Sequence, residues 1–128
     1  KFIKEVINKL KKNGSRVSLF IEPKIKDIKL AKYYFKSDCI EIHTGKICNL
    51  INKNKDYSNE FKKIRKAAFY ATSLGLEVHA GHGLTYKSAK ILSEIDEITE
   101  FNIGHFLIGE AIFISLSKVI KKFKDTIN

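Results

Sequence analysis

Three things are scarce in this sequence of 128 residues: cysteine, arginine and long apolar runs. Cys39 and Cys48 are too few for a disulfide framework, and their spacing matches no CxxC-type metal signature. We therefore expect a reducing, cytoplasmic setting. No apolar run approaches the length of a membrane span and nothing resembles a signal peptide, so we expect no membrane partner.

Arginine is scarce although the formal net charge is +10. Arg16 and Arg65 are the only two arginines, and nearly all of the remaining positive charge is lysine on the polar faces of predicted helices. Proteins that read nucleic acids usually need the planar, forked donor group of arginine. We therefore expect no nucleic-acid partner, whereas small anionic substrates remain compatible with the charge.

The residues that are present alternate between helical and extended patterns. Strands alternating with helices favour a parallel sheet with right-handed crossovers. A doubly wound sheet and part of a (β/α)8 barrel both remain open at this point. The predicted elements are a helix over 2–10 ended by Asn13-Gly14, a strand over 16–23, a helix over 25–35, a strand over 39–45, a helix from a Ser58 cap to Leu74, a strand over 76–81, a helix over 86–93, a strand over 98–104 and a long helix over 108–123.

The number of strands is half of what a barrel requires. A complete (β/α)8 barrel has eight strands and typically takes about 250 residues. The first helix would also normally follow an earlier strand. No linker or low-complexity segment divides residues 1–128, so we expect one part of a single domain.

Histidines lie at or near the ends of the predicted strands: His43, His79, His82 and His105. In parallel α/β proteins the carboxyl edge of the sheet is where ligands bind. His79 and His82 are three residues apart, a spacing that on a strand sends two side chains to opposite faces. No Asp or Cys completes a ligand set, so we predict no metal site.

Glu41 and His43 are two residues apart on a predicted strand and therefore share a face. If that face points into a barrel, both side chains project toward its mouth. Two interpretations remain open: the two residues act in a site, or they are inward polar groups satisfied by their neighbours.

Two Gly-His pairs each follow a strand and precede a helix, in "AGHGLTY" and "NIGHF". Glycine allows close approach of a ligand to the backbone, and a helix N-terminus favours an anion. The alternative is that these glycines serve only as turns. A histidine here can also transfer protons near neutral pH, and together with Glu41 it suits chemistry at a carbonyl or imine. The residues thus predict an enzyme of the lyase or synthase type that acts on a phosphorylated substrate.

Four motifs occur in order and carry a family resemblance: "RVSLFIEP", "IEIHTG", "ATSLGLEVHAGHGLTY" and "EFNIGH". They resemble the C-terminal half of the pyridoxine 5'-phosphate synthase family of vitamin B6 biosynthesis. The resemblance runs from Arg16 into the last helix. It implies a (β/α)8 TIM barrel of which this chain supplies about strands five to eight with their helices, the N-terminal half being absent from the sequence.

The resemblance also implies an activity. Enzymes of this family are transferases that condense 3-amino-2-oxopropyl phosphate with 1-deoxy-D-xylulose 5-phosphate. The products are pyridoxine 5'-phosphate, phosphate and water, and neither a metal nor an organic cofactor takes part. The family's usual assembly is a homo-octamer, and a cytoplasmic location is expected.

Five site residues follow from the resemblance. His82 matches the family's proton donor, and Glu41 matches a glutamate assigned to transition-state stabilisation. Gly83 matches a residue that contacts the amino-oxopropyl phosphate substrate. Gly104 and His105 match the pair that binds its phosphate.

The chain departs from the family pattern in places. The family usually has Asn at the position of His79, and "HTGKICN" lacks the Tyr-Ala that commonly follows HTG. "GLTYKSA" likewise replaces a more usual continuation that contains Asn. None of these changes removes an assigned residue, and the resemblance gives no role to His43 or His79.

The resemblance places a general-base histidine and a second catalytic glutamate in the other half of the barrel. We therefore expect these 128 residues alone to be inactive. The alternative is a non-catalytic basic α/β module that binds polyanions and keeps the barrel motifs for packing.

Overall fold

Four parallel strands form one sheet in the computed structural model, which describes residues 2–127. Lys1 and Asn128 lie outside that range. The strands are β1 (Ser18–Ile21), β2 (Cys39–His43), β3 (Glu77–Gly81) and β4 (Ile98–Asn102). Their order in the sheet is their order in the chain, and helical segments connect each strand to the next.

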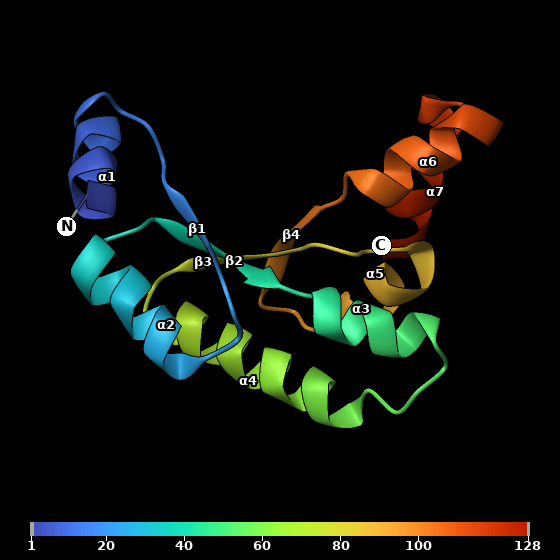
Figure 1. The fold of residues 1–128 in the computed structure, drawn as a ribbon, viewed down its shortest axis with the longest axis horizontal. Coiled ribbons are helices and arrows are strands. Elements are labelled where there is room, and N and C mark those ends of the chain that lie inside the picture. Colours follow the sequence, from blue (N-terminus) through green and yellow to red (C-terminus); the bar gives the residue numbers. More distant parts are fainter. Residues whose placement is uncertain (1, 128) are drawn as a thin grey trace.

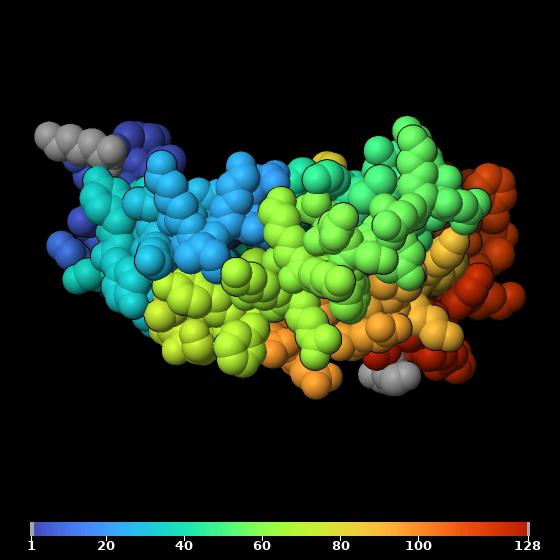
Figure 2. All heavy atoms as spheres, turned by 90° about the horizontal axis from the view of Figure 1, so that it is seen from below, coloured from blue at the N-terminus to red at the C-terminus, as the bar shows by residue number. Residues whose placement is uncertain are grey.

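Helices α2, α3 and α4 lie on one side of the sheet, whereas α1 and α6 stand at its two opposite ends (Figure 1). Figure 2 shows that side, where α2, α4 and α3 form a continuous layer. None of the helices within 2–127 has the length and apolarity needed to cross a membrane. They are α1 (Phe2–Lys12), α2 (Ile25–Lys29) continued by the π-helix η1 (Leu30–Phe35), α3 (Gly45–Asn52), α4 (Ser58–Ser73), α5 (Tyr86–Leu92), α6 (His105–Ile114) and α7 (Leu116–Ile127).

The sheet has an apolar face toward the helices. Ile40 and Ile42 of β2 and Val78 and Ala80 of β3 are fully buried in one core with side chains of α2, α3 and α4. Because successive strand residues point to opposite faces, the alternate residues point away from the helices. These include Phe20, Glu41, His79 and Glu100, which are lateral neighbours across the four strands.

The strand order decides between the two architectures that the sequence leaves open. In a doubly wound sheet the order reverses at a switch point, whereas strands of a barrel follow one another in sequence. The order β1-β2-β3-β4 has no reversal, so the α/β fold is confirmed and is consistent with part of a (β/α)8 barrel.

Helix α3 is absent from the sequence-based prediction, which extends a strand to Gly45. In the structure β2 ends at His43 and Gly45 begins α3. Ile47, Cys48 and Ile51 are its buried residues, with a spacing typical of a helix. The helix is short and starts at a glycine, so its pattern is weak in the sequence alone.

Two further predictions are wrong in detail. Ser58 does not cap α4 but begins it, and Asp56 Oδ1 accepts hydrogen bonds from the Ser58 N–H (2.9 Å) and hydroxyl (2.7 Å). The long final helix is interrupted at Ser115, whose φ of 78° lies outside the helical region. The chain therefore has two helices here, α6 and α7, instead of one. Val119 and Phe123 of α7 are buried against α5.

Candidate active site

The loops that follow β3 and β4 enclose a cavity of about 550 Å³ at the carboxyl edge of the sheet. Four of the five residues that the sequence assigns to the site line it: His82, Gly83, Gly104 and His105. Asn52, Leu84, Thr85, Asn102, Ile103 and Phe106 complete the lining. The two Gly-His pairs therefore contribute to one cavity.

Glu41, the fifth assigned residue, is held at the border of this cavity by Asn102. The Asn102 amide donates a hydrogen bond to Glu41 Oε2 at 2.9 Å. The other carboxylate oxygen lies directly over Gly81, in the space that a Cβ at that position would occupy. Glycine at position 81 thus leaves room for the Glu41 carboxylate, and Asn102 fixes its orientation.

Buried Thr44 fixes the turn that carries His82. The Thr44 hydroxyl lies 2.7 Å from the Gly81 carbonyl oxygen and 2.9 Å from the His82 carbonyl oxygen. The backbone N–H of Thr44 also donates a hydrogen bond of 2.9 Å to the Gly81 carbonyl oxygen. His82 has a φ of 79° and Gly83 a φ of 80°, so both residues lie in the left-handed region. Histidine tolerates this region better than most residues, and glycine adopts it readily.

Gly83 also packs closely against α3. A Cβ at Gly83 would lie 3.2 Å from Cys48 Cβ, so this turn leaves little room for a larger residue. Burial raises the pKa of the Cys48 thiol, although hydrogen bonds with Ser88 and Thr44 oppose the shift. Cys48 is therefore a packing residue beneath the turn, with a thiol that ionises less readily than usual.

Helix α6 begins at the cavity with exposed His105, and Gly104 precedes it. Within residues 2–127, no side chain caps this helix. Helix α5, which begins at the same cavity, differs because Thr85 and Ser88 form a capping box that satisfies its first turn. The start of α6 is therefore the better place for an anion, since its N–H groups remain available.

Glu41 and His43 share a face of β2 but bind different partners. Glu41 bonds Asn102, whereas His43 Nδ1 lies 2.7 Å from Glu22 Oε1. The His43 ring stands edge-on to that of His82, with 4.8 Å between their centroids. The structure therefore brings His43 to His82 and leaves Glu41 with Asn102.

His79 lies within β3, two residues before its end, and it does not line the cavity. Its Nε2 is 2.8 Å from Glu77 Oε1, and its Nδ1 is 3.5 Å from Glu100 Oε1. Hydrogen bonds from His79 and from Arg16 lower the pKa of Glu77. Among the described residues, no three His, Cys, Asp or Glu side chains are arranged to hold a metal ion.

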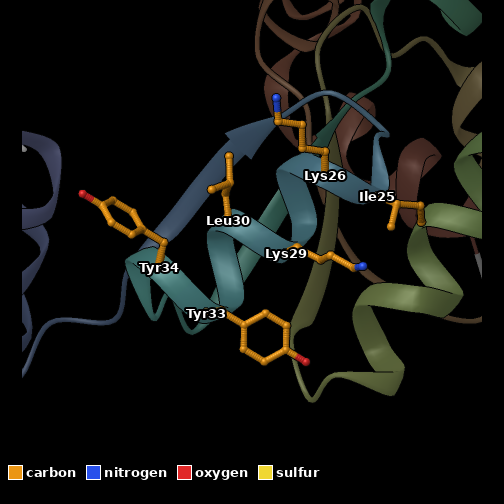
Figure 3. Close-up of a pocket in the computed structure, with 6 residues that line it drawn as sticks. All are labelled: Ile25, Lys26, Lys29, Leu30, Tyr33 and Tyr34. Atoms are coloured by element: carbon orange, nitrogen blue, oxygen red, sulfur yellow. The ribbon is translucent and has the colours of Figure 1, made fainter.

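A second hollow, also of about 550 Å³, lies on the outer surface along α2 and η1. Its walls come from a single helical segment (Figure 3), and the six side chains point in different directions. They are Ile25, Lys26, Lys29, Leu30, Tyr33 and Tyr34. Because ligand sites usually have polar groups that converge, we place the functional site in the cavity at the sheet edge.

Comparison with known families shows which family the chain belongs to. The model of the family described as pyridoxal phosphate biosynthesis protein PdxJ matches residues 1–128. The chain belongs to the PdxJ family. The resemblance inferred from the four motifs is thereby confirmed.

Curated relatives of this chain are named pyridoxine 5'-phosphate synthase. The protein of Pelagibacter ubique is 55% identical over 128 residues, which is 100% of this chain and 53% of that protein. The protein of Zymomonas mobilis is 48% identical over 122 residues, or 95% of this chain and 46% of that protein. That of Sulfurihydrogenibium sp. is 44% identical over 126 residues, or 98% of this chain and 51% of that protein. The chain thus spans about half the length of the curated relatives it matches.

The sequence analysis missed several residues that shape the candidate site. Gly81 and Asn102 orient Glu41, Thr44 fixes the His82 turn, and Glu22 binds His43. All four lie inside the motifs that carry the family resemblance. Their effects depend on contacts between neighbouring strands, which no pattern along one strand reveals.

Proposed function

We propose that this chain supplies one wall of the active site of a pyridoxine 5'-phosphate synthase, as the C-terminal half of its barrel. The reaction condenses 3-amino-2-oxopropyl phosphate with 1-deoxy-D-xylulose 5-phosphate, as the family resemblance implies. The observation that carries the proposal is the cavity in which His82, Gly83, Gly104 and His105 meet.

In this proposal the start of α6 binds the phosphate of the amino-oxopropyl substrate. Gly104 has open space around its Cα, so an anion can approach the backbone there. His105 follows as the first helical residue, where the helix dipole favours negative charge. Gly83 forms the opposite side of the same cavity.

His82 acts as the proton donor to the reacting substrate, and Glu41 stabilises positive charge in the transition state. His82 is exposed and lines the cavity, so its imidazole can reach a bound substrate. Glu41 is oriented by Asn102, which leaves its carboxylate fixed before substrate arrives. Neither role requires a metal or an organic cofactor.

The assembly and location belong to the same proposal. We expect a homo-octamer, as the resemblance implies, with parts of the apolar surface of α6 buried in the complete protein. We also propose a cytoplasmic location, which the two free thiols of Cys39 and Cys48 support.

The test measures formation of pyridoxine 5'-phosphate from both phosphorylated substrates by the full-length protein. The His82→Asn variant is expected to lose about 100-fold or more in kcat, since general acid catalysis typically contributes that much. His79→Asn serves as the matched control, because it changes a histidine outside the cavity, and it is expected to retain activity. Full activity of His82→Asn would remove this residue from catalysis.

The same preparation tests the alternative of a basic binding module. Salt-dependent binding to a polyanion such as heparin, with no affinity for either phosphorylated substrate, would favour that alternative. Substrate turnover by the wild-type protein excludes a purely non-catalytic role.

A further inference from the structure

The His82 side chain needs an orienting contact that its own hydrogen bonds do not supply. Thr44 holds its backbone, but within residues 2–127 its ring contacts other rings and makes no side-chain hydrogen bond. A proton donor must be placed accurately, because a misplacement of about 1 Å can cost about 100-fold in rate. The neighbouring rings are therefore the groups that can set its orientation.

His43 is the closer of these neighbours, and Glu22 fixes it. The distance of 2.7 Å between His43 Nδ1 and Glu22 Oε1 is that of a strong, charge-assisted hydrogen bond. Because the carboxylate accepts, the proton lies on Nδ1. Glu22 directly precedes Pro23, which restricts its backbone to extended conformations. The pair is thus anchored at the end of β1.

The rings of His43 and His82 meet at Gly45. A Cβ on Gly45 would lie 2.9 Å from both His43 Nε2 and His82 Cδ2, so neither ring could keep its place beside a larger residue. Phe20 flanks both rings, at 5.1 Å from His43 and 6.4 Å from His82 between centroids. The His82 imidazole therefore stands in a frame built by β1, β2 and the start of α3.

We propose that Glu22 and His43 are positioning residues that hold the His82 imidazole in the orientation required for proton donation. They act through His82, in a chain that runs from the Glu22 carboxylate to the His43 ring and from that ring to His82. The kinetic part of this proposal rests on the function proposed above.

The test compares variants of the full-length synthase in steady state with both phosphorylated substrates. Glu22 is partly exposed, so its replacement is compatible with folding. Glu22→Ala is expected to lower kcat by about 10- to 100-fold with unchanged KM values, since the substrate still binds. Glu22→Gln is expected to remain close to wild type, because its amide oxygen still accepts the His43 proton.

His43→Ala is expected to match Glu22→Ala, and combining the two should add no further loss, since both act through one contact. His79→Asn is again the matched control: its ring is 2.8 Å from a glutamate oxygen but lies outside the cavity. Wild-type kcat in His43→Ala would overturn the proposal. A raised KM with an unchanged kcat in His43→Ala would also overturn the proposal, because it would assign His43 to substrate binding.

A second readout separates this proposal from the proposed function. The ring nitrogen NMR signals of His82 report its tautomer and mobility without any substrate. They are expected to shift or broaden in Glu22→Ala and to be retained in Glu22→Gln. If the signals respond in this way but the wild-type protein has no synthase activity, the proposed function is refuted and the positioning role stands. Identical His82 signals in all variants would refute the positioning role.

Discussion

At the level of single residues, the position of Glu41 depends on the absence of a side chain at Gly81. Its carboxylate occupies the space above Gly81 and accepts a hydrogen bond from Asn102. Any side chain at position 81 would push the carboxylate aside. Glycine is required here for space, because Gly81 is not among the glycines with positive φ.

Gly81→Ala is therefore expected to preserve the fold and to impair the site. The flexible Glu41 side chain can swing away, so we expect a change in unfolding free energy within about 1 kcal/mol. In the full-length protein kcat should fall about 10- to 100-fold, because the carboxylate is misplaced.

Gly104→Ala is the control for this prediction. A Cβ at Gly104 meets no atom within 4 Å, so the variant should leave Glu41 in place. It should raise the KM of the amino-oxopropyl substrate, because the methyl group obstructs the approach to α6. A Gly81→Ala protein with wild-type kcat would show that Glu41 is not needed in its present orientation.

At the level of elements, Asp38 joins α1 to the sheet just before β2. Its carboxylate lies 2.7 Å from Lys11 Nζ on α1 and accepts a hydrogen bond of 2.9 Å from the Val17 N–H. The Lys11 hydrogen bond, followed by that of Val17, lowers the pKa of Asp38 from its ordinary value of 3.8. The ionised carboxylate is therefore favoured in the folded state.

This shift gives a pH dependence of stability with a definite sign. The pKa of Asp38 is lower in the folded than in the unfolded state. The contribution of its carboxylate to stability is therefore complete above the unfolded pKa and disappears as the pH falls through the folded pKa. Urea denaturation should show wild type more stable than Asp38→Asn at pH 7, with the difference shrinking below about pH 4. The Lys11→Met variant should lose less stability than wild type as the pH falls from 7 to 3, because it lacks the lysine that pairs with Asp38. A difference that stays constant from pH 7 to pH 3 would contradict this assignment.

The elements also show how far the sequence predicts this fold. The four strands and α1, α4 and α5 follow from apolar patterns and glycine stops, and the structure has them close to the expected positions. Helix α3 and the break at Ser115 do not follow, because a short helix gives a weak pattern and a left-handed serine has no sequence signature. The site follows the same division: Gly-His pairs mark the cavity, whereas Glu22 and Asn102 gain their roles only when neighbouring strands meet.

At the level of the whole molecule, large apolar side chains are exposed at both ends of the sheet. Phe2 on α1 is 75% exposed, and Ile112 and Phe113 on α6 are 78% and 83% exposed. Among the described residues, β1 and β4 each pair with a single strand, so each leaves an open edge. Open edges and apolar surfaces of this kind favour association with further polypeptide. They match a chain that spans about half the length of its relatives.

The last prediction therefore concerns completion of the barrel. We expect the 128-residue chain alone to show no synthase activity. Fusing it to the part of the Pelagibacter ubique synthase that it does not match should give a folded chimera that forms pyridoxine 5'-phosphate, since the matched parts are 55% identical. The chimera should also bind less of a hydrophobic dye per chain, because the surfaces around Phe2 become covered. A matched chimera carrying His82→Asn controls for activity of the added part. Synthase activity in the unfused chain, or a folded chimera without activity, would contradict the division of the site between two halves of one barrel.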